Sequence, residues 1–288
     1  MASPSAPTSV PFAKQLGRQA ILLAVSILTL YPVLWVVKIA LSPADALGSS
    51  LSPVPEAITL DNFRAVVSRT DAAGNVLFPI QLWNSLVVSI ATTVVGIVLS
   101  TTAGYAFSRF SFPGKEGGMK AFLVTQMFPG VVMAVPLYIV MDELGLLNSM
   151  LGLTLVYSTT SVPFSVWMLK GYFDTIPRDL EEAALVDGAS QWTIFTRVVL
   201  PLAMPAIVVT ALFSFMTAWN EFILAATFLS GERNMTLPVV LYSYVDETST
   251  DWGPFAAGAI LVSLPVMFLF FVLQKHLVGG LTAGSVKG

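Results

Sequence analysis

Long apolar segments separated by short polar ones form the main pattern of this chain. A helix needs about 20 mostly apolar residues to cross a hydrocarbon core of roughly 30 Å. Several runs contain a proline, which inside a bilayer kinks a helix without ending it, because neighbouring groups satisfy the freed carbonyl. Six runs meet the length, and they predict six transmembrane helices near residues 19–40, 82–107, 120–141, 150–169, 202–229 and 255–273.

The composition agrees with this pattern and excludes a soluble domain. Of the 288 residues, 55% are hydrophobic and 11% are charged, whereas soluble proteins have about 25% charged residues. Cysteine is absent, which removes disulfides, thiol catalysis and cysteine-ligated metals. The one histidine, His276, cannot form a metal site or a Ser-His-Asp set by itself. We therefore expect a transport or binding role, with no catalytic residues, no metal and no cofactor held by this chain.

The basic residues predict the orientation, because Lys and Arg near span ends are retained in the cytoplasm. Placing both termini in the cytoplasm leaves only Arg64, Arg69 and Arg233 on the opposite face. The cytoplasmic segments then hold Lys14, Arg18, Arg109, Lys115, Lys120, Lys170, Arg178, Arg197, Lys275 and Lys287. The outer loops are acidic instead.

A polar stretch, residues 171–201, interrupts the apolar pattern on the predicted cytoplasmic side. It opens with acids that complement a helix N-terminus: Asp179, Glu181 and Glu182. Gly188 is suited to end this first helix in a left-handed cap, Ser190 to cap a second short helix, and Pro201 to end it. The residues alone leave two interpretations open, an amphipathic connector that only covers the bundle or a docking surface for a partner.

The same stretch resembles the EAA loop of ATP-binding cassette (ABC) importer permeases. The shared motif is Glu-Ala-Ala, three residues, Gly and a terminal Leu-Pro, here at Glu182, Ala183, Ala184, Gly188, Leu200 and Pro201. Further segments look like the carbohydrate-uptake branch of that family, and within it like maltose and maltodextrin uptake: WNS at 83–85, STTAGYAFSRFSFPGK at 100–115, QMFP at 126–129, KGYF at 170–173, WNEF at 219–222 and GLTAGSVKG at 280–288.

The resemblance implies a fold and a domain organisation. It predicts an all-α membrane protein of the type I ABC importer permease fold, with six transmembrane helices and a cytoplasmic coupling-helix loop. Residues 1–13 then form a mobile cytoplasmic tail and 14–278 the transmembrane domain, with the EAA loop at 171–201. A flexible cytoplasmic tail follows at 279–288.

The resemblance also implies the partners. These are a second permease subunit, a homodimeric ATPase subunit that binds ATP and Mg, an extracytoplasmic sugar-binding protein and the bilayer of a bacterial or archaeal inner membrane, with no nucleic acid. Coupling to the ATPase would fall to Glu182, Ala183, Ala184, Asp187, Gly188, Leu200 and Pro201. The C-terminal tail would reach the ATPase interface through Leu281, Thr282, Gly284 and Lys287. The expected cargo is maltose or maltodextrin, with trehalose or a related glucoside as the alternative.

Two further sets of residues are candidate functional sites. Glu221 lies inside a predicted span, where ionisable groups mark pathways by default, and its neighbours Trp219 and Asn220 are candidates with it. A hydrogen bond across helices explains Glu221 equally well. Residues 231–255 form a long acidic and aromatic outer segment, in which the resemblance makes Tyr242, Tyr244 and Trp252 candidates for contact with the binding protein. The alternative is an ordered lid on the bundle.

Functions of other classes fit the sequence less well. An ion-coupled secondary sugar carrier is the main alternative, and it normally has intramembrane ionisable pairs and an internal inverted repeat. A membrane-embedded enzyme needs several convergent polar or metal-binding residues at one depth. The sequence has none of these signals, and without a nucleotide-binding motif it requires a partner chain for ATP hydrolysis.

Overall fold

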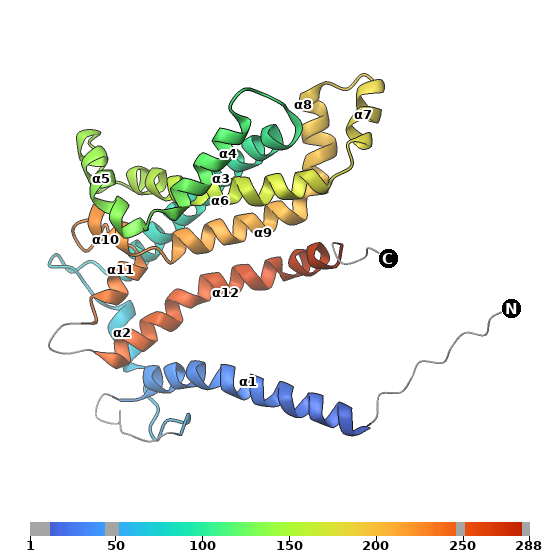
Figure 1. The fold of residues 1–288 in the computed structure, drawn as a ribbon. Coiled ribbons are helices and arrows are strands. Elements are labelled where there is room, and N and C mark those ends of the chain that lie inside the picture. Colours follow the sequence, from blue (N-terminus) through green and yellow to red (C-terminus); the bar gives the residue numbers. More distant parts are fainter. Residues whose placement is uncertain (1–11, 44–51, 246–250, 284–288) are drawn as a thin grey trace. The chain divides into compact units, whose positions relative to one another are not determined.

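The computed structural model describes residues 12–43, 52–245 and 251–283, and regular structure in these ranges is helical (Figure 1). The helices are α1 (Phe12–Leu41), α2 (Asp61–Val67), α3 (Phe78–Arg109), α4 (Lys115–Met127), α5 (Gly130–Glu143), α6 (Met150–Thr175), α7 (Asp179–Val186), α8 (Gln191–Ile194), α9 (Leu200–Trp219), α10 (Ile223–Phe228), α11 (Leu237–Tyr242) and α12 (Trp252–Ala283). A π-helical turn, Phe195–Val199, joins α8 to α9.

The chain divides into two compact units. The first unit comprises residues 1–66 and 244–261, and the second comprises 67–243 and 262–288. In the first unit the side-chain amide of Asn62 donates to the carbonyl oxygens of Ala40 and Ser42, which ties α2 to the end of α1. Nζ of Lys38 donates to the carbonyl oxygen of Ser52 and lies 4.6 Å from the centre of the Trp35 ring. The candidate site residues, except Tyr244 and Trp252, lie in the second unit.

The described helices include four that are long and apolar enough to cross a membrane: Lys14–Leu41, Phe78–Arg109, Gln191–Trp219 and Trp252–Gln274. A fifth crossing is formed if α4 and α5 are one broken span. The predicted run 150–169 does fold as one helix, the 26-residue α6, but its many Ser and Thr residues make it less apolar than the others. The structure therefore supports four or five crossings by length and composition.

Two of the predicted spans have different bounds. The run 120–141 is not one kinked helix, because α4 and α5 meet at an angle of 103°. Pro129 at the break has no N–H to continue the helical ladder. The run 202–229 is also wrong as a single span, since α9 ends at Trp219 and α10 begins at Ile223.

The core of the second unit is a bundle of α3, α6 and α9, which Figure 1 shows lying side by side. Small residues allow these helices to approach closely. A Cβ added to Gly104 of α3 would lie 3.1 Å from the backbone nitrogen of Lys170 in α6. Some buried hydroxyls in the bundle bond back to their own helix, as Ser158 does to the carbonyl oxygen of Thr154 and Ser165 to that of Ser161. These two hydroxyls are thus satisfied without exposure to lipid.

Gly152 provides a test of this packing. A Cβ at this position would overlap the carbonyl oxygen of Leu146, which is backbone and cannot rotate away. We expect Gly152→Ala to destabilise the protein by about 1–3 kcal/mol, the usual cost of overpacking. Thermal denaturation of the detergent-purified protein measures the effect. Gly117→Ala is the control, because nothing lies within 4 Å of a Cβ there. Equal midpoints for the two variants would contradict the packing described.

Candidate functional site

The segment 171–201 contains the last turn of α6, a helical hairpin formed by α7, α8 and the π-helical turn, and the start of α9 (Figure 1). Helix α7 ends at Val186, and Gly188, which follows its C-cap, has a left-handed backbone with φ of 82°. The N–H of Gly188 donates to the carbonyl oxygen of Leu185, and that of Ala189 donates to Ala184. This pair of bonds is a Schellman motif, which satisfies carbonyls at the helix end. The predicted glycine cap is confirmed.

The second helix begins as predicted but does not end as predicted. Oγ of Ser190 accepts a hydrogen bond from the N–H of Thr193, so Ser190 caps α8. Pro201, which we expected to end this helix, instead lies in the first turn of α9. Helix continues through Pro201 from the π-helical turn, so the proline lacks one backbone donor but does not end the helix. The π-helical turn carries the chain from α8 into α9, and helix is continuous from Gln191 to Trp219.

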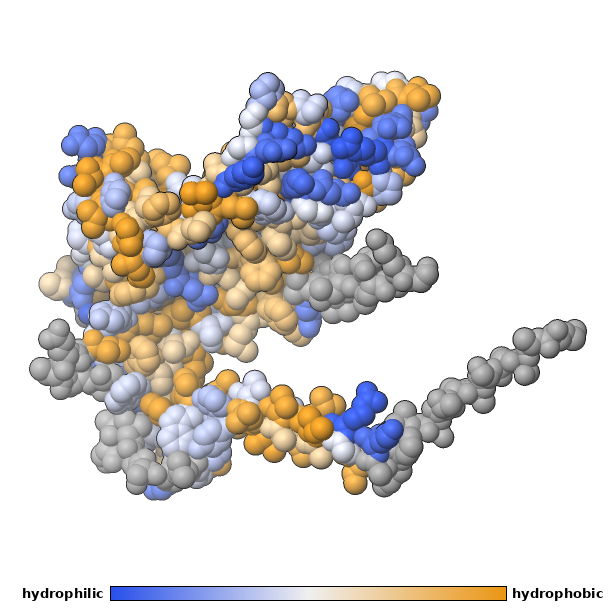
Figure 2. Space-filling view, in the orientation of Figure 1, coloured by the Kyte–Doolittle hydropathy of each residue, from blue (hydrophilic) through white to orange (hydrophobic). Residues whose placement is uncertain are grey.

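The helix α7 has a buried face and an exposed face. Glu181 is buried, and Ala184 packs on the apolar cluster that contains Ile194 and Phe195. Glu182, Ala183, Asp187, Gly188 and Pro201 are exposed, and Leu200 is half-buried. Apolar side chains also point outward here: Val186 is 88% exposed, and Leu180 and Leu185 are each 45% exposed. Figure 2 shows hydrophobic residues at the tip of this otherwise hydrophilic end.

The buried acid of α7 is held by α3. Nε of Arg109 pairs with Oε1 of Glu181, and the Tyr105 hydroxyl donates to Oε2 of Glu181 over 2.9 Å. Nη2 of Arg109 donates to the carbonyl oxygen of Ile176 over 2.9 Å, and Nη1 donates to Oγ of Ser108 over 3.0 Å. Glu181, Arg109 and Tyr105 were not among the predicted site residues, although Glu181 is next to the motif.

The predicted pathway residues make structural contacts. Trp219 is 1% exposed, stacks on Phe215, and its Nε1 donates to the carbonyl oxygen of Val262. The Glu221 carboxylate accepts the N–H groups of Leu224 and Ala225, and so caps α10. Asn220 is exposed, and its side-chain amide donates to the carbonyl oxygen of Met216. These contacts account for Trp219 and Glu221 without a pathway role, which stays a prediction for all three.

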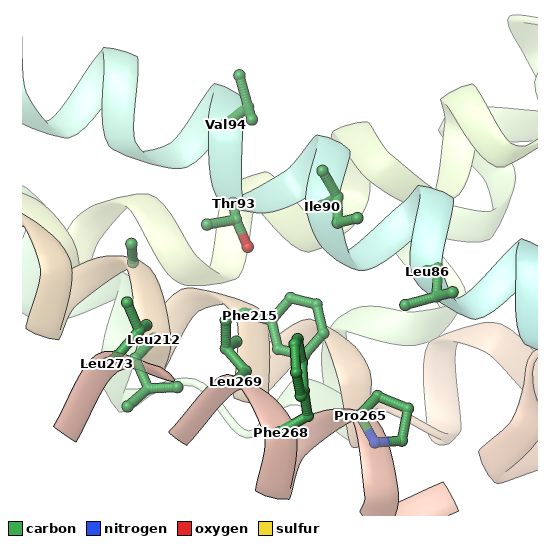
Figure 3. A pocket seen from close by; sticks show the side chains of 11 residues that line it. Leu86, Ile90, Thr93, Val94, Leu212, Phe215, Pro265, Phe268, Leu269 and Leu273 are labelled. Carbon is green, nitrogen blue, oxygen red and sulfur yellow. The ribbon is translucent and has the colours of Figure 1, made fainter. Parts of the chain in front are cut away.

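Two cavities of about 310 Å³ each lie between helices of the second unit. The cavity in Figure 3 is formed by α3, α9 and α12, with Ile90, Phe215 and Phe268 in its lining. Its one lining hydroxyl, that of Thr93, already donates to the carbonyl oxygen of Ser89. This cavity therefore suits hydrocarbon and has nothing with which to hold a polar solute.

The other cavity lies at the break between α4 and α5, and its lining is more polar. It is lined by Thr125, Gln126, Phe128, Gly130, Met133, Leu137, Thr159 and Thr160. Nε2 of Gln126 donates to the carbonyl oxygen of Thr160, which joins α4 to α6 across the cavity. Gln126, at the end of α4, and Thr159, near the middle of α6, are both exposed. Its three threonine hydroxyls also donate to carbonyl oxygens of their own helices, so the cavity offers a polar solute mainly acceptor oxygens, those of the threonines and of the Gln126 amide.

The opposite end of the second unit is fixed by ion pairs between two loops. Arg69 pairs with Glu232, and Arg233 pairs with Asp71. The backbone N–H and side-chain amide of Asn75 hold the pKa of Asp71 below its usual range, so its carboxylate is charged at neutral pH.

The predicted binding-protein contacts and the C-terminal tail are only partly described. Tyr242 and Trp252 are 60% and 54% exposed, whereas the Tyr244 hydroxyl is buried. The segment 246–250 between them lies outside the described residues. Helix α12 includes Leu281 and Thr282, which we expected to belong to a flexible tail, while Gly284 and Lys287 lie outside the described residues.

The chain belongs to the family of binding-protein-dependent transport system inner membrane components, whose model matches residues 96–282. The maltose/maltodextrin transport system permease protein MalG of Yersinia pestis is 37% identical over 285 residues, which are 95% of this chain and 93% of that protein. MalG of Escherichia coli K12 is 39% identical, covering 90% of this chain and 91% of that protein. The trehalose transport system permease protein SugB of Mycobacterium tuberculosis is 35% identical, covering 90% of this chain and 93% of that protein.

Solved structures agree on the fold. A chain of a bacterial ABC transporter involved in the import of the acidic polysaccharide alginate superimposes with a TM-score of 0.76. It is 23% identical, and the match covers 94% of this chain and 99% of that one. A chain of the MetNI methionine ABC transporter gives a TM-score of 0.57 at 16% identity, and the match covers 70% of this chain and 95% of that one. The chain thus has the fold of ABC transporter permeases and is a transport component.

Gly188 provides a test of the hairpin. Proline cannot adopt the positive φ of this position, so we expect Gly188→Pro to abolish substrate uptake while the protein remains in the membrane. Uptake of labelled substrate and the membrane content of the protein are the measurements. Gly188→Asn is the matched control, because asparagine tolerates the left-handed region and nothing crowds this site. Normal uptake by the proline variant would show that the bend has no role in transport.

Proposed function

We propose that this chain is a permease subunit of a binding-protein-dependent ABC importer for a sugar, with maltose or maltodextrin as the cargo. The observation that carries the proposal is the similarity to MalG proteins, at 37–40% identity over at least 90% of the chain. The trehalose and galactooligosaccharide permeases are 35% identical. These relatives support the sugar class more broadly than one sugar, and trehalose is the second candidate.

We count six crossings, with α4 and α5 together as the third and α6 as the fourth. A helix of 26 residues is about 39 Å long, enough for a hydrocarbon core of roughly 30 Å. The serine hydroxyls of α6 that bond back to its own carbonyls lower the cost of placing them in lipid. With both termini in the cytoplasm, the hairpin 171–201 lies on the cytoplasmic face with the basic residues.

In this proposal α7 is the coupling helix that docks on a partner ATPase. Its exposed face supports such a role, because Glu182, Leu180 and Val186 together offer a carboxylate and apolar anchors. The full assembly has a second permease subunit, two copies of the ATPase that bind ATP and Mg, and an extracytoplasmic binding protein. The binding protein contacts Tyr242, Tyr244 and Trp252, and the ATPase contacts the tail from Leu281 to Lys287.

The polar cavity at the break between α4 and α5 lines the sugar pathway. Broken helices leave backbone groups without partners within the helix, and inside a membrane these are tolerated only where they face protein or a wet cavity. The exposed amide of Gln126 at this break fits hydroxyl groups of a sugar better than lipid. Asn220 and Glu221 remain pathway candidates at the end of α9.

Reconstitution tests the proposal as a whole. The chain is expressed with its partner permease, ATPase and binding protein, and the complex is placed in proteoliposomes. Binding protein loaded with maltose should stimulate ATP hydrolysis and drive uptake of labelled maltose, with trehalose and lactose as competitors. Uptake that needs an ion gradient and no ATP would instead establish a secondary carrier.

Glu182→Lys tests the docking face. This change puts a cation at the N-terminal turn of α7 and reverses the charge offered to the partner, so the ATPase should dissociate. Co-purification of the ATPase with the tagged permease measures the effect. Glu116→Lys is the control, because Glu116 is also an exposed acid in a first helical turn, at the start of α4. If the Glu182 variant retains the ATPase in wild-type amounts, α7 is not the docking helix.

Gln126→Leu tests the pathway. Loss of one hydrogen-bonding group costs roughly 1 kcal/mol, so sugar uptake should fall about fivefold. The amount of assembled complex in the membrane serves as the check on folding. Leu137→Met is the control. Leu137 lines the same cavity and the change removes no polar group, so sugar uptake by this variant should stay near the wild-type rate. Equal uptake by both variants would remove this cavity from the pathway.

A further inference from the structure

The last turn of α3 and the first turn of α7 are joined by a buried ion pair. We call Tyr105, Arg109 and Glu181 the Arg109–Glu181 joint. The Arg109 side chain is 7% exposed and the Glu181 side chain 11% exposed. These residues are separated by 72 positions in the chain, so the contact is a tertiary link and not part of a local turn.

Every charged group of the joint has partners. Glu181 receives one hydrogen bond on each oxygen, from Arg109 and Tyr105. Arg109 also donates to the carbonyl oxygen of Ile176 in the connection between α6 and α7. Removing one member of such a pair leaves an uncompensated buried charge, which is costly. The joint therefore holds α7 against α3.

Aromatic contacts extend the joint to the second helix of the hairpin. The Tyr105 ring lies 4.7 Å from the ring of Phe195 in the π-helical turn and 6.0 Å from the ring of Phe173 in α6, measured between centroids. Tyr105 of α3 thus contacts three other elements: the end of α6, helix α7 and the π-helical turn that follows α8.

Neighbouring acids of α7 are placed on different faces. Glu182 is exposed, whereas Glu181 is buried in the joint. Successive residues of a helix point about 100° apart, so one turn of α7 has both an exposed carboxylate and a buried one. The exposed face of α7 and the joint are therefore connected through adjacent residues of one short helix.

We propose that Glu181 and Arg109 are positioning residues that transmit the movement of α7 to the cytoplasmic end of α3. The inference rests on the proposed function, because it takes α7 as the docking helix of an ATPase-driven importer. Helix α3 has 32 residues, so a rigid connection at its end shifts the whole span together with α7. Without the joint, α7 moves with the ATPase while α3 lags behind.

The experiment uses the complete complex in proteoliposomes and measures sugar transported per ATP hydrolysed. Glu181→Gln keeps the size of the side chain and removes its charge. The ratio should fall about fivefold or more, the low end of the range for coupled sites. Tyr105→Phe is a milder second variant, because it removes one hydrogen bond and keeps the ring contacts with Phe195 and Phe173.

Lys115→Gln is the control. Lys115 is a basic residue just beyond the same end of α3, where its Nζ donates to the carbonyl oxygen of Phe110 and not to a residue of α7 or of the joint. The ratio of sugar to ATP should stay at the wild-type value in this variant. A fall in the control equal to that in Glu181→Gln would overturn the inference, because the loss of any charge at this end would then have the same effect.

A distance measurement separates transmission from simple stabilisation. The chain has no cysteine, so spin labels on Thr102→Cys in α3 and Asp179→Cys in α7 report one distance. We expect this distance to be equal in nucleotide-free and ATP-bound wild-type complexes, and to change with nucleotide in Glu181→Gln.

The outcomes are distinguishable. If wild-type complex does not couple uptake to ATP hydrolysis, the proposed function itself is wrong. If the wild type is coupled and Glu181→Gln and Tyr105→Phe keep the same sugar-to-ATP ratio, the inference is overturned. A variant that lowers uptake and hydrolysis by the same factor, with a constant label distance, would also overturn it, because the joint would then only stabilise the fold.

Discussion

Three long helices, α3, α6 and α9, meet where their side chains are smallest. A Cβ added to Gly96 of α3 would lie 3.2 Å from Oγ of Ser214 in α9 and 3.5 Å from Oγ of Ser161 in α6. In a bilayer there is little hydrophobic gain from helix association, so close van der Waals packing at small residues holds such helices together. The same approach continues at Gly104, against Lys170. Since Tyr105 and Arg109 follow within the next turns of α3, this packing brings them to the loop that begins where α6 ends.

Local features of the chain were predictable, because they depend on residues close in sequence. The Ser190 cap and the left-handed Gly188 follow from short-range hydrogen bonding, and both are confirmed. The apolar runs also predict where helices form. Their ends are harder to predict, because Pro129 fits a kink in a span as well as a break. The end of α9 depends on Glu221, whose carboxylate caps α10, and average hydropathy contains no information about such a cap.

The joint was not predictable for a different reason. Asp179, Glu181 and Glu182 all suit the first turn of a helix, so charge alone does not show which of them is buried. That choice depends on Arg109, which is distant in sequence, and on the angle at which α6 delivers the chain to α7. The motif residues Glu182 and Ala183 point outward, and the residue that anchors the helix lies directly before them. A motif on the exposed face of a helix therefore says nothing about what holds that face in place.

Helix α3 connects the two ends of the second unit. At one end, the Gln81 amide donates to the carbonyl oxygen of Glu232, the Asn84 amide donates to that of Arg233, and Oγ of Ser85 accepts the N–H of Leu237. At the other end, Arg109 and Tyr105 hold Glu181. Arg109 is the one charged residue in the sequence of α3. The helix is thus polar where it holds loops and small or apolar where it packs between helices. Because a helix transmits displacement along its axis, a shift of α3 at α7 also moves the hydrogen-bonded segment between Glu232 and Leu237 at the opposite end.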